Sequence, residues 1–239
     1  MKEETLGKIF EFIKENSKQN LPLFWKMKNN IPLTEEDLTV KGDLNLINSK
    51  ITSLPDGLKV EGELDLSYSN IKSLPKGLIV NSHLVLEESE IRSLPEGLKV
   101  GGNLILASCE YIFSLPKGLK VGHILDLTKS NIKTLPEGLE VGHSLWLFGC
   151  WGLTSLPKGL KVGGRLDLTD SDIETLPEGL EVGGNLWLAG CWGLISLPKD
   201  LKVGGSLYIY RTKFTEISDN ELFNMIKPNG YIGEIIGNI

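Results

Sequence analysis

The chain has 239 residues, and its 31 acidic side chains outnumber its 25 basic ones, which gives a formal net charge of −6. Nucleic-acid-binding proteins normally carry a basic surface, so this balance argues against a nucleic-acid partner. No segment approaches the roughly 18 consecutive apolar residues of a membrane span, and the acidic start of the chain lacks the apolar run of a secretory signal. Three cysteines, an odd number, suit a reducing compartment, so we expect a cytoplasmic protein that does not contact membranes.

Residues 1–37 are predicted to form an N-terminal helical cap. Leu6, Ile9, Phe10 and Ile13 recur at helical spacing, and the first coil of a repeat protein needs a cover. Lysines in the same segment would suit an anionic membrane surface, but neighbouring glutamates offset them. Covering the first coil is therefore the favoured role.

Residues 38–217 contain one phrase eight times: Leu-Pro, any residue, Gly, Leu, any residue, Val, with Asp200 in place of the last glycine. Successive copies are 20 or 21 residues apart. A fixed period of this length indicates a stacked solenoid, in which each unit buries its apolar residues against its neighbours. The Leu-Pro pairs begin at Leu54, Leu74, Leu94, Leu115, Leu135, Leu156, Leu176 and Leu197.

Two apolar residues separated by one residue form a short half-buried strand in each repeat. Each strand returns after one full coil, so nine strands are predicted to run parallel. The return limb is rich in Pro and Gly, which favours turns with extended or 3₁₀ segments over a regular helix. The strand pairs are Leu44/Leu46, Leu64/Leu66, Leu84/Leu86, Leu104/Leu106, Leu125/Leu127, Leu145/Leu147, Leu166/Leu168, Leu186/Leu188 and Leu207/Ile209.

A small side chain that can donate a hydrogen bond stands three residues after each strand. Where it is serine or threonine, the next apolar residue follows two places later; where it is cysteine, three places later. That extra residue produces all the 21-residue steps. The position is occupied by Ser49, Ser69, Ser89, Cys109, Ser130, Cys150, Ser171, Cys191 and Thr212.

These two forms resemble the leucine-rich repeat family, whose strand segment reads L-x-x-L-x-L-x-x-N-x-L or L-x-x-L-x-L-x-x-C-x-x-L. The Leu-Pro limb is similar to that of short bacterial and phage-encoded repeats, although serine mostly stands where the family has asparagine. The resemblance implies an α/β fold class: a right-handed leucine-rich repeat solenoid with a parallel sheet of about nine strands, an irregular convex side and small helical caps. It also implies partner binding through the concave sheet.

The three cysteines allow a competing interpretation as a disulfide or metal site. Consecutive cysteines lie 41 residues, or two coils, apart. Two strand spacings are about 9–10 Å, beyond the roughly 7 Å between the Cα atoms of a disulfide. No C-x-x-C pair is present, which argues against zinc. We therefore expect inert buried thiols and no metal.

The residue after each Leu-Pro alternates in sign from coil to coil. Stacked coils would place these opposite charges about 5 Å apart. A solvated edge with weak ion pairs is a better interpretation than a binding strip. The series is Asp56, Lys76, Glu96, Lys117, Glu137, Lys158, Glu178 and Lys199.

Residues 218–239 are predicted to form a C-terminal cap. Ser218 to Glu221 offer the chemistry of a helix start, for a short helix through Lys227. The apolar tail 231–236 would then close the last strand of the sheet, although an uncovered edge also allows pairing with another chain.

Aromatic residues gather on the expected concave face of the C-terminal half, where exposed aromatics are common at interface hot spots. Duplication of a two-coil unit is an alternative explanation, because Trp146/Trp187 and Trp151/Trp192 both recur after 41 residues. For Trp151 and Trp192 we expect packing. The candidate partner-binding residues are Asp126, Trp146, Phe148, Arg165, Asp167, Trp187, Tyr208 and Tyr210.

Little in the sequence indicates catalysis. His123 and His143 occupy equivalent places in adjacent coils without an evident third ligand, and no phosphate-binding loop or nucleophile elbow is present. Nothing after Thr212 suggests the ubiquitin-ligase domain, with its catalytic cysteine, of some bacterial relatives. We therefore predict a non-enzymatic module without cofactors that binds a partner protein, in the manner of a bacterial effector or a phage counter-defence protein. The alternative is a carbohydrate-binding repeat protein that uses Trp146 and Trp187, two coils apart.

Overall fold

The computed structural model describes residues 23–227 and 229–237, and the chain divides into two compact units, Met1–Thr39 and Val40–Ile239. In the first unit, helix α2 (Leu23–Lys28) precedes the short 3₁₀ helix η1 (Glu36–Leu38), and the ammonium of Lys26 pairs with the carboxylate of Asp37. The helix predicted around Leu6 to Ile13 lies outside the described residues.

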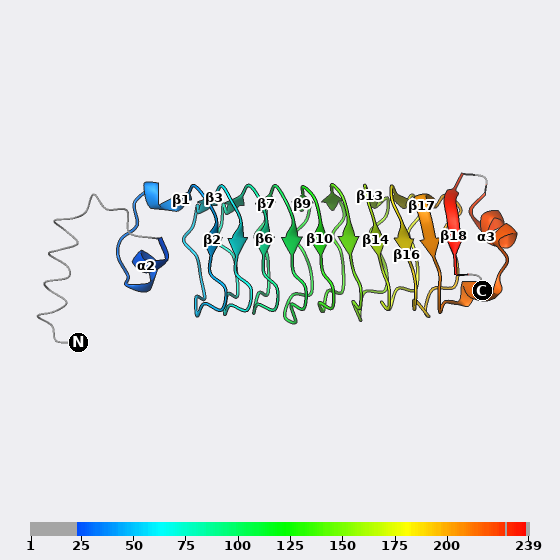
Figure 1. The fold of residues 1–239 in the computed structure, drawn as a ribbon, viewed down its shortest axis with the longest axis horizontal. Helices are drawn as coiled ribbons and strands as arrows, with labels where there is room; N and C mark the ends of the chain where they lie inside the picture. The colour runs from blue at the N-terminus through cyan, green and yellow to red at the C-terminus, as the bar shows by residue number, and fades with distance from the viewer. Residues whose placement is uncertain (1–22, 228, 238–239) are drawn as a thin grey trace, which may run out of the picture. The chain divides into compact units, whose positions relative to one another are not determined.

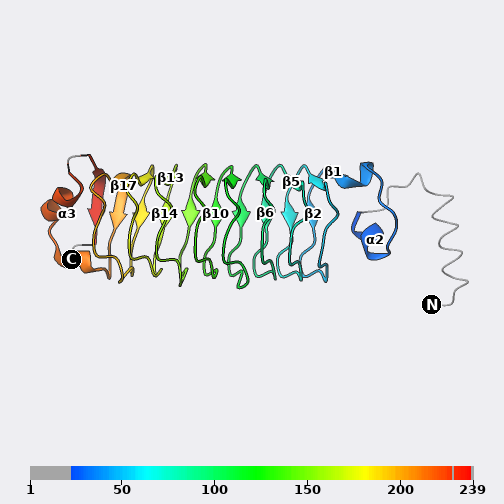
Figure 2. The same cartoon turned by 180° about the vertical axis from the view of Figure 1, so that it is seen from behind.

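The second unit is a parallel β-solenoid whose coils follow one another in chain order (Figures 1 and 2). Its main strands, which we call the leucine ladder, pair in parallel with each leucine opposite the leucine of the next coil. All nine predicted strands are confirmed. They are β2 (Leu44–Asn45), β4 (Leu64–Asp65), β6 (Leu84–Val85), β8 (Leu104–Ile105), β10 (Leu125–Asp126), β12 (Leu145–Trp146), β14 (Leu166–Asp167), β16 (Leu186–Trp187) and β17 (Lys202–Tyr208).

A second set of parallel strands, the valine ladder, precedes the leucine ladder in each coil. It places the valine of each repeat opposite the valine of the next, and the long strand β17 belongs to both ladders. This ladder was not predicted from the sequence. Its strands are β1 (Thr39–Val40), β3 (Lys59–Val60), β5 (Ile79–Val80), β7 (Lys99–Val100), β9 (Lys120–Val121), β11 (Glu140–Val141), β13 (Lys161–Val162) and β15 (Glu181–Val182).

The return limb contains no regular helix anywhere in residues 39–212, as its Pro and Gly content predicted. Isolated parallel bridges join Ser73 to Ser93, Ser114 to Thr134, and Ser155 to Thr175. In the seven repeats that have it, the turn glycine has a φ of +64° to +76°, a conformation that side chains disfavour. The repeated Leu-Pro-x-Gly phrase is therefore a turn requirement.

The interior of each coil is apolar: the strand leucines are buried, apart from half-buried Leu44 in the first coil, as are the leucines of the turn and the valine that follows. The small residue after each strand is also buried, except for half-buried Ser49, and its hydrogen bonds differ between serine and cysteine. The hydroxyls of Ser69 and Ser171 donate to carbonyls of their own coil at 2.6 Å, whereas each cysteine thiol donates to a strand carbonyl of the preceding coil at 3.0–3.1 Å.

The three cysteines are free and fully buried, as predicted. Burial raises the pKa of Cys109 and Cys191 to about 11 and that of Cys150 to about 12. Because the thiolate is the reactive form, these thiols are unreactive near neutral pH.

The C-terminal segment closes the leucine ladder. After the 3₁₀ helix η2 (Lys213–Glu216), helix α3 (Asp219–Ile226) begins with a capping box between Ser218 and Glu221. Strand β18 (Tyr231–Ile236) then pairs in parallel with β17. Of the two possibilities left open for the apolar tail, the structure shows the one in which it closes the sheet.

Charged side chains on neighbouring coils form weak surface pairs. On the edge after Leu-Pro, Lys158 and Glu178 lie 3.6 Å apart. The closer pairs lie on the valine ladder, where Lys161 and Lys202 both contact Glu181, at 2.9 and 2.8 Å. Their hydrogen bonds, first that of Lys202 and then that of Lys161, lower the pKa of Glu181 to about 2.

This lowered pKa predicts an acid-sensitive contribution to stability. A carboxylate whose pKa is depressed in the folded state stabilises above its ordinary value of 4.5 and loses this effect as the pH falls towards about 2. We expect the thermal midpoint of Glu181→Gln to fall less over this range than that of the unaltered protein at low salt, and the difference to shrink at high salt. Glu137→Gln, an exposed glutamate outside the ion pairs of the described residues, is the control; an equal response of both variants would contradict this role.

Candidate binding face

One row of side chains projects from the leucine ladder, because residues alternate between the two faces of a strand. The leucines point inward and are buried, so the residue between them points outward. The register confirms that the predicted central row is continuous across the coils. It reads Asn45, Asp65, Val85, Ile105, Asp126, Trp146, Asp167, Trp187 and Tyr208, and we call this surface the strand face.

The C-terminal part of the strand face carries a cluster that we call the aromatic stack: Arg165, Trp187, Tyr208 and Tyr210. The rings of Trp187 and Tyr208 stack with centroids 3.8 Å apart and planes 11° apart. The guanidinium of Arg165 lies 4.3 Å from the Trp187 ring and also pairs with the carboxylate of Asp167. Tyr210 approaches Tyr208 at 6.5 Å. The structure thus brings five of the eight predicted residues into one contact network.

The two aspartates of the predicted site have a local structural role. Asp126 and Asp167 are 9% and 7% exposed, and each accepts a hydrogen bond from the backbone N–H two residues later, at 2.9 and 3.0 Å. This Asx turn precedes a residue with positive φ, Lys129 or Asp170. The aspartates therefore shape the end of the strand and present little surface to a partner.

Trp146 and Phe148 are half-buried and lie outside the aromatic stack. Trp146 stands between Asp126 and Asp167 in the register, and the ring of Phe148 lies under the ammonium of Lys129 at 5.9 Å. Among the described residues, the indole N–H groups of Trp146 and Trp187 are buried without a hydrogen-bond acceptor. An unsatisfied buried donor costs about 1–3 kcal/mol.

We predicted that Trp151 and Trp192 pack against the solenoid, and this prediction is wrong. Their side chains are 67% and 60% exposed, which makes them the most exposed tryptophans of the described residues. Both follow a cysteine in the longer, 21-residue coils, at a position that is also exposed in shorter coils, for example at Asn131 and Asp172. A count of coil lengths would have indicated protruding loops here, but nothing in the repeat predicts which way the indole points.

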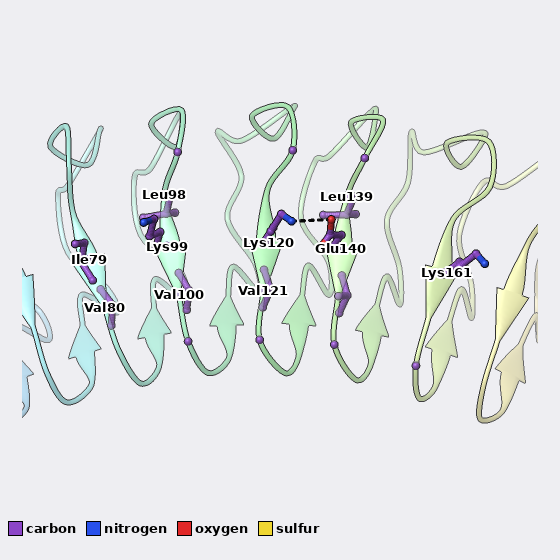
Figure 3. Close-up of a pocket in the computed structure, with 18 of the residues that line it drawn as sticks. Ile79, Val80, Leu98, Lys99, Val100, Lys120, Val121, Leu139, Glu140 and Lys161 are labelled. Carbon is purple, nitrogen blue, oxygen red and sulfur yellow. Dashed lines mark ion pairs between the residues drawn. The ribbon is translucent and has the colours of Figure 1, made fainter.

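A shallow groove of about 1,090 Å³ also runs along the valine ladder (Figure 3). Glycines line its floor, and Lys99, Lys120, Glu140 and Lys161 stand along it, with Lys120 and Glu140 paired at 2.9 Å. This surface was missed in the sequence analysis because the valine ladder itself was missed.

Neither His123 nor His143 belongs to a metal-like cluster: no group of three or more His, Cys, Asp or Glu suited to a metal occurs in the described residues. The Nδ1 atom of His143 instead lies 2.8 Å from the hydroxyl of Ser144. In the described ranges, no helix has the length and apolar character needed to cross a bilayer.

The fold and the strand face define a class: a parallel β-solenoid repeat protein with a stacked aromatic patch on its strand face. Beyond this class, the chain matches no protein-family model, no curated protein and no solved structure.

Proposed function

We propose that this protein is a non-catalytic interaction module that binds a partner protein through its strand face. The observation that carries the proposal is the aromatic stack, in which Arg165, Trp187 and Tyr208 lie face to face across three coils. Tryptophan, tyrosine and arginine are the residue types enriched at interface hot spots.

The arrangement of the aromatic stack supports this proposal in energetic terms. Binding costs free energy when flexible side chains must be ordered at an interface. Here Trp187 is held between its neighbours and Arg165 is fixed by Asp167, so little ordering remains when a partner docks. The rings of Trp187 and Tyr208 are half-buried, and Tyr210 is 37% exposed. Together they offer a partner both apolar area and hydrogen-bonding groups.

The alternative, carbohydrate binding through Trp146 and Trp187, is less well supported. A sugar ring binds tryptophan by stacking on an open face of the indole. Tyr208 comes from the coil after Trp187 and Arg165 from the coil before it, so the two cover opposite faces of that ring. Glycan-array binding that disappears in Trp187→Ala would favour this alternative.

The finer classification belongs to the same proposal. The strand leucine pairs recur every 20 or 21 residues, and most strands are followed by a buried serine or cysteine. Both features support membership of the leucine-rich repeat family. Three free, buried thiols support a reducing, cytoplasmic setting. A bacterial effector or a phage counter-defence protein is the role we propose within that family.

Affinity purification with mass spectrometry, run beside Trp187→Ala, tests the proposal. The purified partner should bind the unaltered protein and lose about thirtyfold in affinity with Trp187→Ala, as expected of a hot spot worth about 2 kcal/mol. Tyr111→Ala removes an exposed ring away from the strand face and should leave the affinity unchanged. Equal affinities of all three proteins would contradict the proposal.

A further inference from the structure

Trp151 and Trp192 line one groove of about 600 Å³, which we call the edge groove. Asp172 and Glu174 line it between the two tryptophans. Ligand sites in proteins typically occupy about 300–1,000 Å³, so the edge groove is large enough to take a side chain or a short segment of a partner.

The groove results from the alternation of coil lengths. Trp151 and Trp192 each stand one residue after a buried cysteine, in coils that carry the extra residue. Asp172 stands at the equivalent place after Ser171, in the shorter coil between them. The two tryptophans therefore come from the coils on either side of the Asp172 coil, and all three residues line the groove.

The charges of the edge groove are unequal. Its lining carries three carboxylates, of Asp170, Asp172 and Glu174, and one ammonium, of Lys129; Asp170 pairs with Arg211, and Lys129 lies over the ring of Phe148. Asp172 and Glu174 are exposed, and neither takes part in an ion pair within the described part of the chain. The space between the tryptophans is therefore negatively charged.

The spacing of the walls suits an organic cation. Trp151 and Trp192 are two coils apart, a backbone separation of about 9.5 Å. A cation midway would lie about 5 Å from each wall, inside the roughly 6 Å over which an indole ring attracts a positive charge. Asp172, on the coil between the two tryptophans, lines the same groove and would supply the opposite charge. A neutral ligand of the same shape would gain the two stacking surfaces but not this attraction.

We infer that the edge groove binds an arginine or lysine side chain of a basic peptide segment, held between Trp151 and Trp192 and paired with Asp172. This inference deepens the proposed function, on which it rests, by giving the partner protein a chemistry: the partner carries a basic segment in addition to the surface that covers the aromatic stack. Charge complementarity decides in favour of a basic peptide over a neutral sugar chain.

Isothermal titration with hexa-arginine tests the inference, with hexa-citrulline as the uncharged peptide of the same shape. Hexa-arginine should bind and hexa-citrulline should bind at least tenfold more weakly. Trp192→Ala should lower the affinity for hexa-arginine about tenfold, and Asp172→Asn should lower it severalfold with a weaker salt dependence. Both altered side chains are exposed, so the variants should keep the thermal midpoint of the unaltered protein. Tyr111→Ala, another exposed ring, is the matched control with no expected effect.

Three results would overturn the inference: no binding of hexa-arginine at millimolar peptide, equal binding of hexa-citrulline, or equal affinities of Trp192→Ala and Tyr111→Ala. Binding of cellohexaose that disappears in Trp192→Ala, without binding of hexa-arginine, would assign the groove to a sugar chain instead. The titration uses no natural partner. Its failure therefore leaves the strand-face proposal standing, and failure of the affinity purification leaves the peptide result standing.

Discussion

Replacing Gly122 with alanine is expected to lower the free energy of unfolding by about 3 kcal/mol, the upper end of the usual cost of overpacking. Gly122 lies between the valine ladder and the leucine ladder, where its N–H donates to the carbonyl of Val100 at 3.2 Å. A Cβ atom there would overlap the carbonyl oxygen of Gly101 in the preceding coil. Because the overlapping atoms are backbone atoms of the preceding coil, the two coils would have to separate. Urea-induced unfolding measures the loss.

Asn81→Ala is the matched control for Gly122→Ala. Asn81 occupies the same position of an earlier coil, where a Cβ atom is already accommodated, and its side chain is exposed. We expect its stability to change by less than about 0.5 kcal/mol. Gly142, whose Cβ would meet the oxygen of Gly122 in the same way, should behave like Gly122. Equal stabilities of the Gly122 and Asn81 variants would contradict the close approach of the coils.

Leu147→Ala is expected to cost about 3 kcal/mol, within the range seen when a buried leucine is truncated. The Leu147 side chain is fully buried in the middle of the leucine ladder, and its N–H donates to the carbonyl of Asp167 at 2.7 Å. In a solenoid each coil contacts only its neighbours, so the cavity cannot be filled from elsewhere.

Leu147→Met keeps the volume and apolar character of the side chain and should cost less than about 1.5 kcal/mol. The same urea titration compares the two variants. If the methionine variant proved as unstable as the alanine variant, the loss would not come from a cavity in the leucine ladder.

Strong periodicity made the leucine ladder predictable. A pair such as Leu64 and Leu66, repeated at 20 or 21 residues, leaves one arrangement that buries every leucine, namely parallel strands in register. The same reasoning placed the buried cysteines, whereas the closing strand was expected from the apolar tail 231–236, with pairing to another chain left open. The capping box at Ser218 was also readable, because its donors and acceptors are local in sequence.

The valine ladder was missed although Leu58 and Val60 alternate around Lys59 as Leu64 and Leu66 do around Asp65. The Pro and Gly just before this pair indicated a turn, so the segment was expected to be irregular or extended but not to form a paired strand. The need for glycine on this ladder could not be predicted from the sequence either. Gly122 has an ordinary backbone conformation, and its need for a missing side chain becomes visible only when the next coil is in place.

The candidate site was predicted in position but not in detail. Because the register was correct, Trp187 and Tyr208 were expected to be neighbours, and they stack. The contact of Arg165 with Trp187 depends on rotamers that sequence does not fix. The exposure of Trp151 and Trp192 was predicted wrongly, since the position after the buried small residue faces solvent in coils of either length, as it also does at Asp172.

The central claim is that successive repeats stack in register at one strand spacing, and paired cysteines on the valine ladder test it most directly. Lys120 and Glu140 are register partners on neighbouring strands, about 4.8 Å apart, whereas Lys99 lies one strand further from Glu140, at about 9.5 Å. The double variant Lys120→Cys with Glu140→Cys should form an intrachain disulfide on mild oxidation, since Cα atoms within about 7 Å can be bridged. Lys99→Cys with Glu140→Cys should not. Equal disulfide yields in the two variants, or none in the first, would contradict the stacked register.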